Sequence, residues 1–119
     1  MSVGAGRPLP FAVERVYYLF DVPGEQTRGT HAHRALQQLI VAASGSFEVE
    51  LCDGVGTRRV RLDDPTVGLY VPRMLWRDLH AFSHDAVCLV LASAAYDEAD
   101  YIRDYDEYLR LAGAPSRRT

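Results

Sequence analysis

Short stretches in which apolar and polar residues alternate recur along most of the chain. The clearest is 46–52, SFEVELC, in which Phe47, Val49 and Leu51 alternate with polar neighbours. A two-residue period of this kind predicts a strand with one buried face. Six more short segments, rich in β-branched or aromatic residues, are predicted strands: 13–20, 36–44, 57–63, 67–72, 76–82 and 86–93.

Turn-forming residues separate these segments. Asp53 and Gly54 predict a hairpin turn over 53–56, and the sequence DVPGEQTRG at 21–29 predicts a loop. Many short strands joined by turns are typical of an all-β sandwich or barrel. The chain is therefore expected to be all-β, with one domain over 11–111 that follows a loose, Gly- and Pro-rich segment at 1–10.

The pattern changes near the C-terminus. Apolar residues at positions 101, 102, 105, 108 and 109 follow several acidic residues, and Gly113 comes after them. This spacing predicts an amphipathic helix over about 97–111, with acidic residues at the end that the helix dipole favours. Residues 112–119 are expected to form a short tail.

Composition narrows the class of protein. The 119 residues, 48% of them hydrophobic, suffice for one core, and the net charge of −3 argues against nucleic acid as a partner. The apolar runs LIVAA and AVCLVLA are too short to span a membrane, and no signal peptide is evident. Cys52 and Cys88 form no C-x-x-C motif, so we expect a reduced, cytoplasmic protein without disulfides.

The motif RGTHAH places His31 and His33 on the same side of an extended chain. Small metal-binding barrels of the cupin type use such a pair with a later glutamate and a further histidine, but Gln38 and Arg77 stand at those positions. A neutral amide and a cation are poor ligands, so metal binding is disfavoured. Two interpretations remain: histidines held by structural hydrogen bonds, or proton transfer near neutral pH, with an oxyanion stabilised by Arg77 or a tyrosine.

Five segments together resemble a known family: RVYYLFD, RGTHAH, VGLYVP, the strand that begins at Trp76, and LASAAYDEADYIRDYDEY. They are similar to the dTDP-4-oxo-6-deoxyglucose 3,4-ketoisomerases, a group of small cupins. The resemblance implies a cupin-type jelly roll, a homodimer, and no metal or other cofactor. It also implies an isomerase that moves the ketone of a dTDP-linked 4-oxo-6-deoxyhexose from C4 to C3, in deoxy-aminosugar biosynthesis.

The resemblance also implies roles for individual residues. His31 and His33 are the acid–base pair, with His31 as the base that faces the sugar. Tyr17 is grouped with them as a hydroxyl that hydrogen-bonds a sugar oxygen, the alternative being an ordinary strand aromatic. The expected substrate-binding residues are Arg15 and Arg28 for the diphosphate, and Gln38, Arg77 and Trp76 as lining residues, with simple packing the favoured alternative for Trp76.

Two other functions stay open at this point. A sugar-nucleotide binding module would keep the barrel without turnover, and a related cupin epimerase would exchange the same proton without moving the ketone. Family members usually have further strands before the position of Phe11, where this sequence has the Gly- and Pro-rich stretch. Both histidines and the arginines are present, which favours the enzyme.

Overall fold

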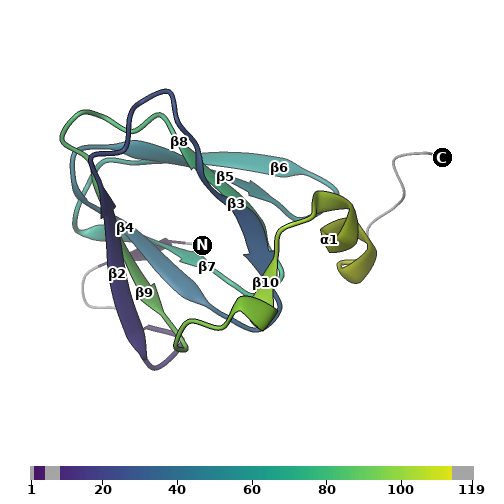
Figure 1. Ribbon diagram of the computed structural model, residues 1–119. Coiled ribbons are helices and arrows are strands. Elements are labelled where there is room, and N and C mark those ends of the chain that lie inside the picture. Colours follow the sequence, from purple (N-terminus) through teal and green to yellow (C-terminus); the bar gives the residue numbers. More distant parts are fainter. Residues whose placement is uncertain (1, 5–8, 114–119) are drawn as a thin grey trace.

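Two antiparallel five-stranded sheets face each other in the computed structural model, which describes residues 2–4 and 9–113 (Figure 1). The first sheet has the order β1 (Ser2–Gly4), β7 (Val67–Val71), β4 (Gln38–Ser44), β9 (Val87–Ala92) and β2 (Arg15–Phe20). The second has the order β10 (Tyr101–Ile102), β3 (Arg28–His33), β8 (Trp76–His80), β5 (Phe47–Cys52) and β6 (Thr57–Leu62). This architecture is the expected cupin-like, all-β fold.

The space between the sheets holds the main hydrophobic core. Alternate residues of each strand point into it, as in β5, where Phe47, Val49 and Leu51 are buried. The core also draws from β4, β7 and β9, with Ile40 and Val90 at most 2% exposed. Apolar side chains fill this part of the barrel. The buried polar residues His33, Gln38 and Arg77 lie at one end of it.

The seven strands predicted from the pattern all form, with ends shifted by a few residues. The turn at 53–56 also forms: the Asp53 side chain accepts hydrogen bonds from the backbone N–H groups of Val55 and Gly56. The expected loop at 21–29 was wrong at its end, because Arg28 and Gly29 already belong to β3. The polar sequence RGTHAH lacks the apolar alternation that marks a strand. β3 forms because it pairs with β8 and β10.

The helix expected over about 97–111 was wrong in its first half. A 3₁₀ turn, η1 (Glu98–Asp100), leads into β10, and only α1 (Tyr105–Leu111) is α-helical. Asp97 and Asp104 explain the break, since each accepts a hydrogen bond from a backbone N–H two residues later and so caps its own short element.

The short helix α1 lies on the outer face of the second sheet (Figure 1). Tyr108 is fully buried there, and its hydroxyl lies 3.0 Å from the carbonyl oxygens of Cys52 and Met74. The rings of Tyr105 and Tyr108 pack against Trp76 at centroid distances of 5.1 and 5.6 Å. This second cluster anchors the C-terminal segment that also supplies β10.

At the N-terminus, the expectation of a loose segment was wrong for 2–4, because β1 pairs with β7 in the first sheet. The rest of that expectation at 1 and 5–8, and most of the expected tail, at 114–119, lie outside the described residues. In the part of the chain that the structure describes, no helix has the length and apolar character needed to span a membrane.

Candidate active site

A bulge in β3 sets the position of His31. The β3–β8 register shifts between Gly29 and His31, and the two residues Gly29 and Thr30 both have positive φ, of 85° and 56°. A Cβ on Gly29 would lie 3.3 Å from the Arg77 carbonyl oxygen, so glycine suits the position. Thr30 has a strained backbone conformation, of a kind that is common at functional sites. The bulge leaves the Gly29 carbonyl oxygen 2.8 Å from His31 Nδ1.

His31 and His33, here called the histidine pair, contact each other directly. Their Nε2 atoms are 3.1 Å apart, and their rings meet edge to face at a centroid distance of 4.7 Å. The Nδ1 of His33, which is buried, lies 3.0 Å from Oδ2 of Asp100. The ring of Tyr101 packs on both imidazoles, at centroid distances of 4.8 Å and 4.4 Å.

The surroundings lower the pKa of both imidazoles. Burial is the larger cause for His31, and with the positive charge of Arg77 it lowers the pKa to about 4. Burial and Arg77 also lower the pKa of His33, while the Asp100 carboxylate opposes the shift. Burial and Arg77 therefore act against the imidazolium form of either ring near neutral pH.

A polar network from the first sheet reaches the same end of the barrel. The Gln38 side-chain amide donates to the hydroxyl of Tyr17, 3.1 Å away, and its oxygen accepts a hydrogen bond from Nη1 of Arg77. Burial raises the pKa of Tyr17, so its phenol stays protonated and can donate a hydrogen bond. Tyr17 and Gln38 belong to β2 and β4, so both sheets contribute to the site.

Arg77 is a buried cation, with 1% of its surface exposed. Its Nε and Nη2 donate to the Leu75 carbonyl oxygen, and no salt bridge to it is found among the described residues. Burial lowers its pKa to about 10, at which it remains charged near neutral pH. A fixed positive charge beside the histidine pair stabilises negative charge that develops on a bound molecule.

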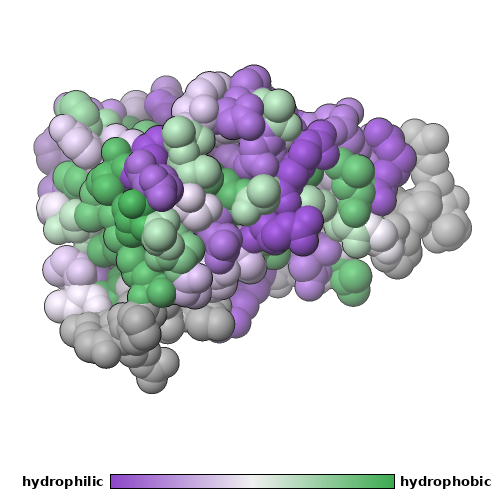
Figure 2. Space-filling view, turned by 90° about the horizontal axis from the view of Figure 1, so that it is seen from below, coloured by the Kyte–Doolittle hydropathy of each residue, from purple (hydrophilic) through white to green (hydrophobic). Residues whose placement is uncertain are grey.

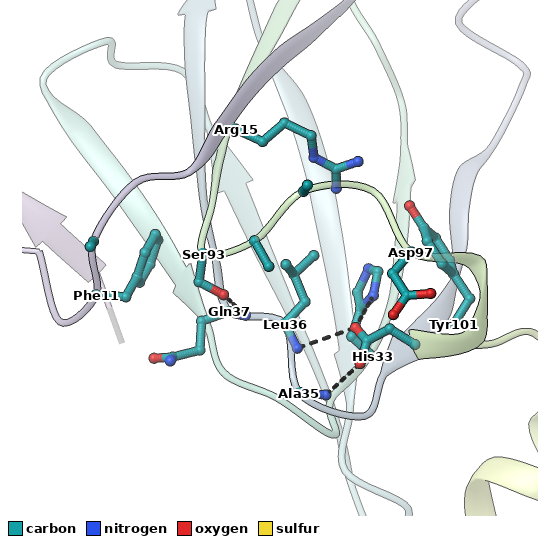
Figure 3. Close-up of a pocket in the computed structure, with 13 residues that line it drawn as sticks. Phe11, Arg15, His33, Ala35, Leu36, Gln37, Ser93, Asp97 and Tyr101 are labelled. Carbon is teal, nitrogen blue, oxygen red and sulfur yellow. Dashed lines mark hydrogen bonds and ion pairs between the residues drawn. The ribbon is translucent and has the colours of Figure 1, made fainter.

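A cavity of about 440 Å³ opens next to these residues (Figure 3). Figure 3 shows Arg15 reaching over it, with His33 and Tyr101 at one end and Phe11 at the other. Nε and Nη2 of Arg15 are buried without a hydrogen-bond partner in the described structure, and its guanidinium lies 5.1 Å from the centre of the Tyr17 ring. Arg15 can therefore take an anionic partner at the cavity.

Of the five expected substrate-binding residues only Arg15 lines this cavity, and of the histidine pair only His33 does. Arg28 lies opposite Leu79 on the inner side of β3, and its side chain donates to the Thr27 carbonyl oxygen. Trp76 lies beneath α1 against Tyr105 and Tyr108, which is the packing that was favoured for it. The six other residues expected from the sequence lie at one end of the barrel: Arg15, Tyr17, His31, His33, Gln38 and Arg77.

Asp100 and Tyr101 were not among the site residues predicted from the sequence. Their acidic and aromatic side chains fitted the expected helix, because acidic residues near a helix N-terminus interact favourably with the helix dipole. In the structure, Asp100 also accepts hydrogen bonds from the backbone N–H groups of Ala35 and Leu36, at 2.8 and 3.2 Å. The aspartate thereby ties η1 to the turn after β3. The one available signal was the block YDEADYIRDY itself.

No group of three or more His, Cys, Asp or Glu side chains suited to hold a metal ion occurs within residues 2–4 and 9–113. The ring nitrogens of the histidine pair contact Gly29, Asp100 and each other. Gln38 and Arg77, the other two positions of the cupin pattern, bind one another. This donor set suits hydrogen bonding and proton transfer rather than metal coordination.

The sequence was also compared with those of known proteins and protein families. The family model described as "FdtA: WxcM-like, C-terminal" matches residues 1–113. The chain belongs to this family. It is 47% identical over 108 residues to the TDP-4-oxo-6-deoxy-alpha-D-glucose-3,4-oxoisomerase of Aneurinibacillus thermoaerophilus. The aligned residues cover 91% of this chain and 78% of that protein.

Solved structures of family members have the same fold. QdtA, a sugar 3,4-ketoisomerase from Thermoanaerobacterium thermosaccharolyticum in complex with TDP, is 42% identical, with a TM-score of 0.87 over 88% of this chain and 77% of that one. The WlaRB TDP-quinovose 3,4-ketoisomerase of Campylobacter jejuni is 46% identical, with a TM-score of 0.83 over 86% and 78%. Sugar-nucleotide ketoisomerases are thus similar to this chain in both sequence and fold.

Proposed function

We propose that the protein is a sugar-nucleotide 3,4-ketoisomerase, which moves the ketone of dTDP-4-oxo-6-deoxyglucose, or a similar dTDP-sugar, from C4 to C3. The observation that carries the proposal is the histidine pair, which lies beside the buried Arg77 cation and of which His33 lines a cavity large enough for a sugar. The relatives that are similar over nearly the whole chain are named for this reaction. The product is of the kind that deoxy-aminosugar biosynthesis uses.

The residues of the site match the chemistry step by step. A base removes the proton from C3, and the electron pair moves through C3–C4 onto the C4 oxygen to give an enediolate. Arg77 stabilises the negative charge on that oxygen, and Tyr17 donates a hydrogen bond to a sugar oxygen. The C3 hydroxyl then loses its proton while C4 and the C4 oxygen each gain one, which leaves a ketone at C3 and a hydroxyl at C4. One carbon is oxidised and its neighbour reduced, so the balance requires no external redox cofactor.

Arg15 is the proposed contact for the diphosphate. Its guanidinium lies over the cavity that His33 also lines, and two of its nitrogens have no partner among the described residues. Arg28, on the inner side of β3 but outside the cavity lining, is the second proposed contact. Arginine forks match phosphate oxygens, and together these two would balance the charge of a diphosphate in a chain that is net acidic.

The homodimer implied by family resemblance is proposed to form through the outer face of β2 and β9. Val16, Tyr18 and Phe20 are 55%, 59% and 58% exposed on the edge strand, and Leu91 and Leu89 lie opposite the first two in register. Figure 2 shows hydrophobic residues gathered on the side of the molecule where β2 and β9 lie, at the left of the view. A flat apolar face suits an identical face across a two-fold axis. Light scattering would test it: a dimer is expected for the wild type and a monomer for Phe20→Glu.

Incubation with dTDP-4-oxo-6-deoxyglucose in heavy water, followed by NMR, tests the function. The ketoisomerase predicts a 3-oxo product with deuterium at C4. Deuterium exchange without migration of the ketone would instead identify an epimerase. Saturable binding without exchange would identify a binding module, and either of these results would overturn the proposal.

A further inference from the structure

The ring nitrogens of the histidine pair make three contacts, and each contact requires one hydrogen. A neutral imidazole carries a hydrogen on only one of its two nitrogens. Two neutral rings therefore supply two hydrogens. The number of hydrogens that the contacts require follows from what each partner atom can do.

Two of the contacts fix hydrogens on the Nδ1 atoms. The Gly29 carbonyl oxygen can only accept, so His31 must donate from Nδ1. Both oxygens of the Asp100 carboxylate already accept from backbone N–H groups, and a carboxylate can only accept. His33 must therefore also donate from Nδ1, across 3.0 Å.

The third contact joins the two Nε2 atoms at 3.1 Å. With both Nδ1 positions already protonated, two neutral rings would place two lone pairs against each other, which is repulsive. One hydrogen between them turns the contact into a hydrogen bond. We infer that the histidine pair shares a third proton between its Nε2 atoms, and that Asp100 is the positioning residue that fixes the proton there.

The charges around the pair act on the extra proton in both directions. The Asp100 carboxylate favours it, because the unit of this carboxylate and a singly charged pair has no net charge, which suits a buried site. Burial and Arg77 lower the pKa of both imidazoles and act against it, so Asp100 and the contact between the two Nε2 atoms must hold the proton. Arg103 and Glu98 act on His31 with opposite signs and form an ion pair with each other at 2.9 Å. The ring of Tyr101 covers both imidazoles.

For the reaction, and so resting on the proposed function, a shared proton gives the pair one acid and one base at the same pH. The imidazole without the proton takes hydrogen from C3, and the other gives its proton to the C4 oxygen, which forms the neutral enediol. In the second half, one ring takes the C3 hydroxyl proton while the other delivers a proton to C4. The pair holds one proton before and after each half.

The proton count can be measured without substrate. In protein labelled with ¹⁵N at histidine, two-bond ¹⁵N–¹H correlation spectra assign the protonation of each ring nitrogen. At about pH 7 we expect protonated Nδ1 on both rings of the pair and intermediate shifts for both Nε2 atoms. The exposed His84 supplies a reference imidazole outside the pair. Two protons on the pair instead of three, with either both Nε2 atoms or one Nδ1 bare, would overturn the inference even if the isomerase activity is found.

Asp100→Asn tests the positioning role, because an amide keeps the shape but lacks the charge that retains the extra proton. We expect the shared-proton signature to disappear and kcat to fall about ten- to hundredfold with little change in KM. Asp104→Asn removes a carboxylate at the α1 cap and should change neither. An Asp100→Asn enzyme with wild-type kcat and ¹⁵N shifts would exclude the role. The wild-type spectrum decides the proton count whether or not this variant folds.

Discussion

His31 and Arg77 lie directly opposite each other across β3 and β8, so that both side chains are on the inner face of the barrel. The guanidinium acts on the imidazole in two ways. It disfavours the imidazolium form, which keeps the ring available as a base, and in the proposed function it stabilises the negative charge of the enediolate oxygen. A basic group next to a cation is thus the central feature of the site.

The first prediction concerns pH. Because burial and Arg77 lower the pKa of His31 to about 4, falling pH should not convert this imidazole to an imidazolium until well below the usual histidine pKa of about 6.5. The acid limb of kcat should therefore lie well below pH 6.5. In Arg77→Gln the limb should move to higher pH, since one cause of the lowered pKa is gone. The measurement is kcat from about pH 4.5 to about pH 9, with circular dichroism to follow folding.

Arg59→Gln is the matched control for this prediction. Arg59 is exposed on β6, where it forms ion pairs with Glu48 and Glu50. The substitution removes the same charge without touching the site, so the pH profile should stay that of the wild type. An acid limb near pH 6.5 in the wild type, or one that does not move in Arg77→Gln, would contradict the electrostatic account.

The second prediction concerns the histidine pair itself. His31→Asn should lower kcat at least about a hundredfold, the usual contribution of a general base, and His33→Asn should also be strongly impaired. His31 is partly exposed, so its variant should keep its melting temperature. His33 is buried against Asp100, so some loss of stability is expected there. If His31→Asn unfolds yet retains wild-type activity per folded molecule, the pair is structural.

Some of this site was readable in the sequence and some was not. The spacing of His31 and His33 predicts that both imidazoles lie on one face, because that follows from the geometry of any extended strand. The contact with Asp100 joins residues 67 positions apart, and no local pattern encodes such a distance. The acidic residues of that segment were assigned to a helix dipole, whereas Asp97 and Asp104 cap two separate elements.

Some parts of the fold were likewise predictable from the sequence and others were not. Strands with one buried face, such as β5, repeat the two-residue period and were predicted. Part of β3 was missed because its sequence contains a glycine at the bulge and two histidines. These stand in place of the β-branched residues that mark a strand. Trp76 could be assigned to the outer face only once the register with Cys52 and the position of α1 were known.

The third prediction compares two arginines. Arg15→Ala should raise KM for the dTDP-sugar, or Kd for dTDP, more than tenfold with a smaller effect on kcat, since the diphosphate does not change charge in the reaction. Arg28→Ala should also weaken binding, but less, because Arg28 does not line the cavity. Arg15→Lys should recover only part of the affinity, since a fork becomes a point charge. Calorimetry with dTDP measures this, and wild-type affinity in either alanine variant would remove that arginine from the site.

The fourth prediction concerns stability. Tyr108→Phe should lower the free energy of unfolding by about 1–2 kcal/mol, because the carbonyl oxygens of Cys52 and Met74 lose a buried hydrogen-bond donor. Urea unfolding measures this. Tyr96→Phe is the control: its hydroxyl donates to Glu98 at an exposed position, so the change should stay within about 0.5 kcal/mol. Equal effects of the two substitutions would show that the contact beneath α1 does not stabilise the fold.

The last prediction concerns the configuration at C4. A histidine in place of Arg77 could deliver a proton to its own face of the enediolate. Arg77, with a pKa of about 10, stays charged near neutral pH and is a poor proton donor. The phenol of Tyr17, on the other sheet, has a raised pKa and keeps its proton. The histidine pair is then the competent donor.

A proton returned to C4 by the histidine pair arrives from the side on which the C3 proton was removed. We expect this to give the gluco product, dTDP-3-oxo-6-deoxyglucose. The unstable product would be trapped by reduction or by a coupled transaminase, and C4 assigned from proton couplings. A large coupling between H4 and H5, both axial, is the expected result. A small coupling means the galacto product, and it would show that a donor other than the histidine pair, with Tyr17 the first candidate, protonates C4 from the opposite face.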